Sequence, residues 1–415
     1  MMSRKPVRLG VCSVLLIFGL CASAFAQSAV GGGPLTSTLA DTEPGTGVLA
    51  IGPVKVAPGV TVREIGYDDN VFDEPESESP KDDFVAAATP DVSFYSRLRF
   101  VRLSAYAGSE LTYYHEYESE RSVGYAGRAR VDLLLSRIRP FFGAGQTKTR
   151  ARPNGEIDVR ANRREDELSG GLAFELSTTS LLYASTAEFS LRYEDAFEDG
   201  VDLSQTLSRD ATSYQGGLKT DLTPLLSLQL YGSYQEDDFP NEPIRNAKGS
   251  AANATFRFAP DAVVTGIVTV SYRDIDYADP GVKPFRGMVG SASLTYPLLE
   301  IGRFTGAYVR GVEYSFDTVD AYYVENSATL SYTQRLFGEV DLQGKYAHSA
   351  FDYSAREAEP PHKDSLDTAA GSLGYNLRNR TRIAVNYEYA RRRSAAFADR
   401  NYQRRRIYLS WLFAF

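Results

Sequence analysis

The sequence predicts an all-β fold: a transmembrane antiparallel up-and-down β-barrel of about eighteen strands (about 16–18). Three observations lead to this class. The chain opens with a secretory signal, continues in short alternating segments separated by turns, and closes on an aromatic-ended strand. Tyr (27) and Phe (22) are abundant and 34 Gly are spread along the chain, which favours strands over helices. After the signal, no segment has the run of about eighteen consecutive apolar residues that a membrane-spanning helix needs.

The first 26 residues are predicted to be a cleaved signal peptide. Arg4, Lys5 and Arg8 precede the apolar run Leu9–Ala22, and Ala24-Phe25-Ala26 offers a small-x-small cleavage site. A membrane anchor is the alternative, but about fourteen apolar residues are too few to span a bilayer comfortably. A lipoprotein signal at Cys21 is a second alternative, which the large Leu20 disfavours.

Cleavage changes the charge and the cysteine content. Losing three basic residues lowers the 45 Lys and Arg to 42 against 53 Asp and Glu, so the net charge is −11. This acidic balance argues against nucleic acid as a partner. Cys12 and Cys21 both leave with the signal, so the mature chain has no thiol or disulfide.

Residues 27–50 are rich in Gly, Pro and Thr and predict a flexible periplasmic tail, and residues 51–415 predict the barrel. Alternation with period two is clear in segments such as Ser122–Leu133 and Thr381–Tyr389. A soluble sandwich also alternates. The breaks decide between them, because short turns such as Thr223–Pro224 and Arg378–Thr381 alternate with long polar connections such as Asp352–Ser365. An even strand count places both termini in the periplasm.

Aromatic residues are placed at the strand ends, as at two membrane interfaces. Outward-running strands end in Tyr113, Tyr193, Tyr234, Tyr272, Tyr314, Tyr346 and Tyr387, and inward-running strands end in Phe174, Phe258, Tyr296 and Tyr332. Segment 304–314 alternates poorly because Arg310 and Glu313 interrupt either register.

The end of the chain carries an apolar face that includes Trp411, Phe413 and Phe415. It resembles the C-terminal β-signal read by the bacterial outer-membrane assembly machinery, which is therefore an expected partner. The alternative is an ordinary last strand of a soluble protein.

The polar faces of the strands predict a hydrophilic lumen, since a barrel of this size encloses water. The alternative is a lumen that is only wetted and crosslinked by salt bridges. Tyr106 and Tyr231 are candidates for stacking on sugar rings. The predicted pore-lining residues are Arg102, Tyr106, Glu110, Arg128, Arg130, Asp132, Glu167, Glu188, Arg192, Lys219, Tyr231, Arg257, Arg273, Lys345 and Glu388.

Three arginine clusters lie at predicted loop ends, where the choice is between a solvated rim and contacts to lipopolysaccharide phosphates. The clusters are Arg160, Arg163 and Arg164, then Arg391–Arg393, then Arg404–Arg406. Outer-membrane lipid and lipopolysaccharide are thus expected partners.

Neither a catalytic site nor a cofactor or metal site is predicted. His115, His348 and His362 fall in or near loops, where a solvated role is expected and an enzyme is not. Asp68-Asp69-Asn70 could contribute oxygen ligands to Ca²⁺, but a complete calcium loop is missing, so a solvated turn is the better interpretation.

Tyr67-Asp68-Asp69-Asn70-Val71-Phe72 follows the first predicted strand, and Asp82-Asp83-Phe84 opens the second. This arrangement resembles a family of outer-membrane β-barrel porins found beside exopolysaccharide export genes. The resemblance implies an outer-membrane pore for polysaccharide export, with periplasmic polysaccharide-export proteins as partners and no catalytic residues. The alternatives are a generic diffusion porin and a non-conducting structural or adhesive surface barrel.

Overall fold

The computed structural model describes residues 49–414, except 195, 299–300, 318, 356–361 and 378–380. The predicted signal peptide, most of the predicted tail, Phe415 and most of the turn Arg378–Thr381 therefore lie outside the described residues. The first described strand, β1 (Leu49–Ile51), begins within the range predicted as tail and folds back on the start of β2.

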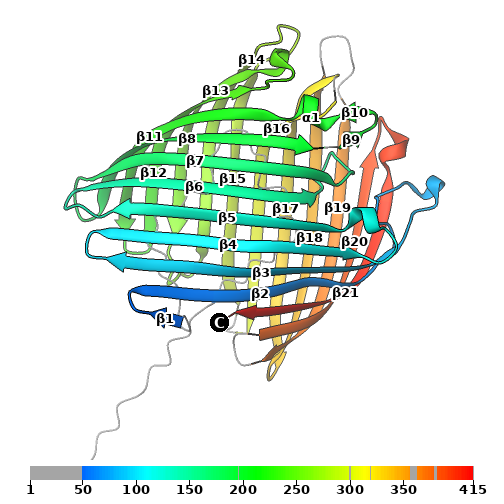
Figure 1. The fold of residues 1–415 in the computed structure, drawn as a ribbon, viewed down its shortest axis with the longest axis horizontal. Coiled ribbons are helices and arrows are strands. Elements are labelled where there is room, and N and C mark those ends of the chain that lie inside the picture. Colours follow the sequence, from blue (N-terminus) through cyan, green and yellow to red (C-terminus); the bar gives the residue numbers. More distant parts are fainter. Residues whose placement is uncertain are drawn as a thin grey trace, which may run out of the picture.

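Within the described residues, eighteen antiparallel strands form one closed barrel, as the sequence predicts (Figure 1). Each strand pairs with its neighbour in the chain, and the first and last strands pair with each other along Gly59–Asp68 and Arg406–Ala414. The strands are β2 (Val54–Asp68), β3 (Asp83–Leu98), β4 (Val101–Tyr114), β5 (Ser122–Leu133), β6 (Ile138–Ala151), β7 (Ala161–Glu175), β8 (Ser180–Glu194), β11 (Arg209–Thr223), β12 (Leu226–Asp238), β13 (Ala247–Phe258), β14 (Thr265–Tyr277), β15 (Phe285–Leu298), β16 (Gly302–Tyr314), β17 (Asp320–Phe337), β18 (Val340–Ala355), β19 (Lys363–Leu377), β20 (Thr381–Ser394) and β21 (Tyr402–Ala414).

The two ends of the barrel differ in their connections. One end, the turn end, carries short links such as 99–100 and 224–225, and both described chain ends lie there (Figure 1). The other end, the loop end, carries the long connections. These hold the hairpin β9 (Phe197–Glu198) and β10 (Val201–Asp202), the helix α1 (Leu203–Thr206), and single 3-10 turns at Glu76–Glu78, Glu118–Glu120, Pro243–Arg245 and Ala398–Arg400. The alternation of short and long breaks in the sequence is thereby confirmed. No helix among the described residues is long and apolar enough to cross a membrane.

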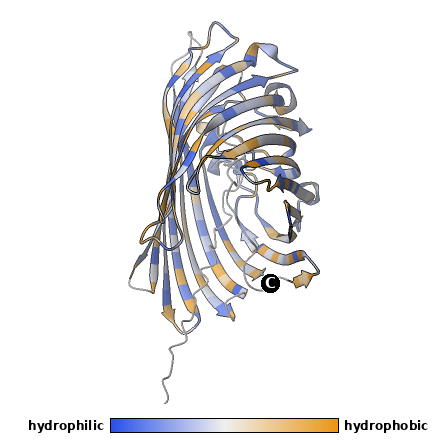
Figure 2. Ribbon diagram, turned by 90° about the vertical axis from the view of Figure 1, so that its left-hand side faces the viewer, coloured by the Kyte–Doolittle hydropathy of each residue, from blue (hydrophilic) through white to orange (hydrophobic). Residues whose placement is uncertain are grey.

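Many large apolar side chains, such as Leu103, Leu168 and Val385, are exposed on the outer face, because alternate side chains point to opposite sides of each strand. Hydrophilic and hydrophobic residues alternate along the strands in Figure 2. Tyr113, Tyr234, Tyr272, Tyr346 and Tyr387 are exposed on the outer face, as predicted, but only Tyr113 lies at the loop end of its strand, and Tyr346 and Tyr387 lie near mid-strand. Tyr193 and Tyr314 were expected in the same girdle, but both are buried inside the barrel.

A β-bulge in β2 breaks the alternation at one point. The register shifts between Val62 and Ile65, so Arg63 and Glu64 both turn inward. Arg63 pairs with Glu110 of β4, and Glu64 lies 3.4 Å from Arg406 of β21. The bulge therefore places an extra charged residue on the inner face beside the seam that closes the barrel.

Candidate functional site

The inner face of the wall is the first part of the candidate site. Of the residues predicted to line the lumen, most alternate with exposed outward residues such as Leu103, Val123 and Leu168, and so face inward. Their role in lining a conducting pore stays a prediction. The inward set is Arg102, Tyr106, Glu110, Arg128, Arg130, Asp132, Glu167, Lys219, Tyr231, Arg257, Arg273, Lys345 and Glu388.

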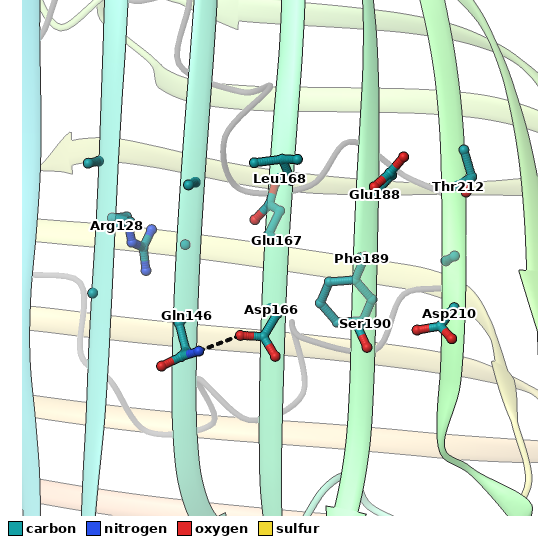
Figure 3. A pocket seen from close by; sticks show the side chains of 15 residues that line it. Arg128, Gln146, Asp166, Glu167, Leu168, Glu188, Phe189, Ser190, Asp210 and Thr212 are labelled. Carbon is teal, nitrogen blue, oxygen red and sulfur yellow. Dashed lines mark hydrogen bonds between the residues drawn. The ribbon is translucent and has the colours of Figure 1, made fainter.

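Glu188 and Arg192 were predicted in the lumen, and this placement is wrong. Glu188 pairs with Leu168 and lies on the same outer face, together with Asp166 and Ser190 (Figure 3). The opposite face of β8 carries Leu191, which is fully buried, and Tyr193. The more apolar face of this strand points inward because it packs against other apolar residues inside the barrel, which leaves the charges outside.

More than half of the arginines in the three clusters form ion pairs inside the barrel and do not face lipid. Arg404 donates to Asp68 at 2.9 Å and lies 3.3 Å from Asp73, and Arg406 pairs with Glu64 and Glu388. Asp68 is thus paired with an arginine, and the predicted solvated turn is wrong for Asp68 and Asn70, which are each 1% exposed. Among the described residues, no group of three or more His, Cys, Asp or Glu is arranged to hold a metal ion.

Arg160 and Arg163 are likewise paired, with Glu120 and Glu165. Within the three clusters, Arg164, Arg391, Arg393 and Arg405 remain on the outer face. Any contact of these clusters with lipopolysaccharide would therefore involve Arg164, Arg405 and the pair Arg391 and Arg393, rather than complete clusters.

The second part of the candidate site is a plug made by connections that turn inward at the loop end. We define the loop plug as residues 152–160, 196–208, 239–246 and 315–317. Its apolar core contains Ile157, Leu203, Leu207, Phe239 and Phe316, each at most 1% exposed. These side chains pack with inward-facing strand residues of the wall in one cluster, which includes Leu191, Ile275, Phe285 and Tyr322.

The plug reaches across the barrel because its segments start from distant strands. Glu156, between β6 and β7, accepts a hydrogen bond from Ser315 Oγ at 2.5 Å and another from the Phe316 N–H at 3.2 Å. Ser315 and Phe316 follow β16, eight strands further round the wall. Beside them, a Cβ on Gly155 would lie 2.5 Å from the Phe351 ring of β18. The β6–β7 connection is therefore in contact with the opposite wall.

Arg392 of β20 anchors this connection. Its guanidinium is fully buried and joins Asp158 of the plug to Asp364 of β19, each at 3.0 Å, and also donates to the Glu156 carbonyl at 3.1 Å. A second bridge runs from Arg400, before β21, to Asp199 in the β8–β11 connection at 2.9 Å. Arg392 of the wall and Arg400 of the β20–β21 connection thus hold two plug segments that start from distant strands.

The hairpin β16–β17 bends inward to meet the plug. Pairing between β15 and β16 stops at Gly290 and Arg310, whereas β16 and β17 stay paired up to Tyr314 and Tyr322. Tyr314 Oη donates to Asp237 of β12 at 2.9 Å. This departure from the wall explains why segment 304–314 alternates poorly.

Glu156 is the carboxyl group whose environment is most unusual. Burial raises its pKa to about 8, although the Ser315 hydroxyl and the nearby Arg400 and Arg392 act in the opposite direction. The phenol groups of Tyr323 and Tyr353 also face it, from β17 and β18. Burial likewise raises the pKa of Glu198 above its ordinary value. The closed plug therefore favours the protonated form of Glu156.

The histidines divide into two environments. His348 faces outward and lies 2.9 Å from Asp367. His362 is not a solvated loop residue as expected, because it stacks on Tyr353 at 4.2 Å and meets Phe397 edge-on. Ser349 follows His348 but hydrogen-bonds to Ser327 on the inner face, so the two do not pair.

The residues predicted as an assembly signal lie on the last strand. Trp411 and Phe413 face outward and are 6.2 Å apart between ring centroids, opposite Ile383 and Thr381 of β20. Phe415 lies outside the described residues.

Comparison with known proteins gives a family and a set of solved barrels. The model of the family described as Putative beta-barrel porin 2 matches residues 49–415. Vanillate-bound OpdK of Pseudomonas aeruginosa is 10% identical, with 87% of this chain and 99% of that chain covered and a TM-score of 0.48. OccAB3 of Acinetobacter baumannii is 11% identical with the same coverage and TM-score. The P. aeruginosa siderophore receptor PirA is 11% identical, covers 87% and 80%, and has a TM-score of 0.41. No curated protein sequence matches the chain.

Proposed function

Because the chain belongs to the family described as Putative beta-barrel porin 2 and is an outer-membrane β-barrel, we propose that it is a diffusion channel for hydrophilic solutes. In this proposal, the loop plug closes the channel. The observation that carries the proposal is the inner face, which holds charged residues of both signs along nearly every strand. Charged side chains facing the interior of an eighteen-strand barrel need water, and a barrel of this width has room for it.

The proposal includes an orientation. We infer that the turn end lies in the periplasm with both chain ends and that the loop end faces outside, because long connections are external in barrels of this class. Solutes entering from outside would then meet the loop plug first. Conduction would require part of the plug to move away from the opposite wall.

Arg392 offers a test of this channel, because it holds the plug to β19. In Arg392→Ala the carboxylates of Asp158 and Asp364 lose their shared partner, so the β6–β7 connection should detach. We expect larger or more frequent openings than wild type in planar bilayers. Arg391→Ala is the matched control, since Arg391 is on the same strand but exposed on the outer face.

The outcomes separate the channel from its alternative. Wild-type openings that increase in Arg392→Ala but not in Arg391→Ala support the channel and its plug. Silence of all three proteins, with heat-modifiable mobility showing folded barrels, would instead favour a non-conducting structural or adhesive barrel.

The narrower proposal is that the solute is a polysaccharide. It draws on the family resemblance and on inner-face tyrosines such as Tyr231, whose ring lies 6.4 Å from that of Tyr183 and has a face suited to stacking on sugars. The plug weighs against it, because a polymer needs a continuous path across the loop end. Block of the Arg392→Ala current by long but not short oligosaccharides would support a polysaccharide solute.

A further inference from the structure

Among the described residues, the inner face of the turn-end half holds more cations than carboxylates. Arg102 and Arg130 share a single carboxylate, Asp132, at 3.3 and 2.9 Å. Arg128, two residues from Arg130 on the same face, instead lies over the Tyr106 ring at 5.6 Å. Arg102 and Arg130 therefore both contact Asp132, and Arg128 adds a third guanidinium to this inner face, where Glu167 of β7 is a nearby carboxylate.

A second basic group lies further round the wall, on β11 and β13. Arg257 of β13 pairs with Ser227 of β12, and Ser227 pairs in turn with Asp221 of β11. Lys219 is two residues from Asp221 and therefore on the same face of β11. Lys219 is attracted by Asp221 and repelled by both Arg257 and Arg139. Lys345, on β18, adds an inward-facing cation on another part of the wall.

On the inner face of the loop-end half, carboxylates outnumber the arginines that they contact in the groups described next. Arg404 faces Asp68 and Asp73, Arg406 faces Glu64 and Glu388, and Arg392 faces Asp158 and Asp364. Asp73 is also paired with Arg152, so six carboxylates contact four arginines in this group, which therefore contributes no excess of positive charge. The positive field of the lumen arises on the turn-end side of the plug.

We propose that the turn-end half of the lumen is a basic vestibule that selects small anionic solutes, such as those bearing carboxylate or phosphate groups. The inference rests on the proposed channel and narrows its solute class. A wall of low dielectric constant concentrates the field of its charges in the water it encloses, which raises the local concentration of anions. Rings of Arg and Lys set anion preference in pores in the same way, and arginine also binds carboxylate and phosphate through paired hydrogen bonds.

The test measures the reversal potential of single channels across a KCl gradient. Wild type should pass chloride in preference to potassium. In Lys219→Gln with Arg257→Gln, the chloride-to-potassium permeability ratio should fall by about twofold or more, because two inner-face charges are lost. Lys248→Gln with Arg286→Gln removes the same charge from exposed outer-face positions and should leave the ratio unchanged.

The outcomes distinguish this inference from the channel itself. Channels that conduct but prefer potassium would overturn the basic vestibule while leaving the channel standing. An equal fall of the ratio in both double variants would also overturn it, since the outer face would then matter as much as the inner. Absence of current in wild type and in Arg392→Ala would defeat the channel, and the vestibule with it.

Discussion

Arg404 and Arg405 are neighbours in sequence with opposite environments. Arg404 is nearly buried between Asp68 and Asp73, whereas Arg405 faces outward. Arg404→Ala should lower stability by about 3–5 kcal/mol, because it leaves the buried carboxylate of Asp68 without its ion-pair partner, whereas Asp73 keeps its ion pair with Arg152. Arg405→Ala should change it by less than about 0.5 kcal/mol. The temperature at which heat-modifiable gel mobility is lost measures both, and similar losses would contradict the assigned faces.

Glu156 should make plug closure depend on pH. Because burial raises its pKa to about 8, the closed plug holds a proton that a free loop, with a pKa of 4.5, releases. The protonated Glu156 therefore stabilises the closed plug fully below pH 4.5. This stabilisation falls by about 1.4 kcal/mol per pH unit as the pH rises toward 8. Open probability should therefore increase with pH over this window.

The matched variants for this prediction are Glu156→Gln and Glu118→Gln. Glutamine keeps the acceptor for Ser315 without ionising, so Glu156→Gln should flatten the pH response of the single-channel open probability. Glu118 lies in another connection and is 76% exposed at its side chain, so Glu118→Gln should retain the response. An unchanged response in Glu156→Gln would show that this group does not control closure.

At single positions, the sequence predicts the face of a residue well where one face of the strand is plainly apolar. Val123 and Tyr125 opposite Arg128 and Arg130 were assigned to the correct faces for this reason. Glu188 and Arg192 were misplaced because β8 has an apolar inner face, which only the plug explains. Inward Arg63 and Glu64 were missed because the bulge between them leaves no signal in the alternation.

The last strand, β21, is the element on which assembly should depend. If Trp411, Phe413 and Phe415 form the segment that the assembly machinery reads, deleting Phe415 should sharply lower the amount of protein in the outer membrane. Loss of one buried Phe would alone cost roughly 1.5–3 kcal/mol, which is small for a whole barrel. Ile383→Ala, opposite Trp411, is the control of similar packing cost. Equal losses in both variants, measured by membrane fractionation, would rule out a recognition role.

Connections differ from strands in how much the sequence reveals about them. Polar runs that interrupt the alternation mark the positions of the loops 69–82, 152–160 and 239–246. Their inward packing was not expected, since loops have no periodicity that encodes a partner. A signal was present nonetheless: Ile157, Leu203, Phe239 and Phe316 are large apolar residues in connections that solvent alone would not favour.

For the whole molecule, the orientation of the barrel follows from labelling single cysteines. The predicted mature chain contains no cysteine, so Lys283→Cys at the loop end and Thr178→Cys at the turn end can be compared without background. A membrane-impermeant maleimide added to intact cells should label the first and not the second. The reverse pattern would invert the orientation proposed above, and labelling of both only after lysis would show that the plug or lipopolysaccharide shields Lys283.

The seam between β2 and β21 is the one contact of the wall that joins residues far apart in the chain, 336 positions between Asp68 and Arg404. All other strand pairs are neighbours in sequence and can form locally. The entropy lost on closing a loop grows only with the logarithm of its length, about 0.6 kcal/mol for each doubling. Inserting or deleting one hairpin, about a tenth of the chain, would therefore leave the cost of closure almost unchanged. The hairpin is thus a unit by which such a barrel can gain or lose strands over evolutionary time. The circumference of the barrel is then limited by hydrogen bonding between adjacent strands, and not by the entropy lost when the first and last strands pair.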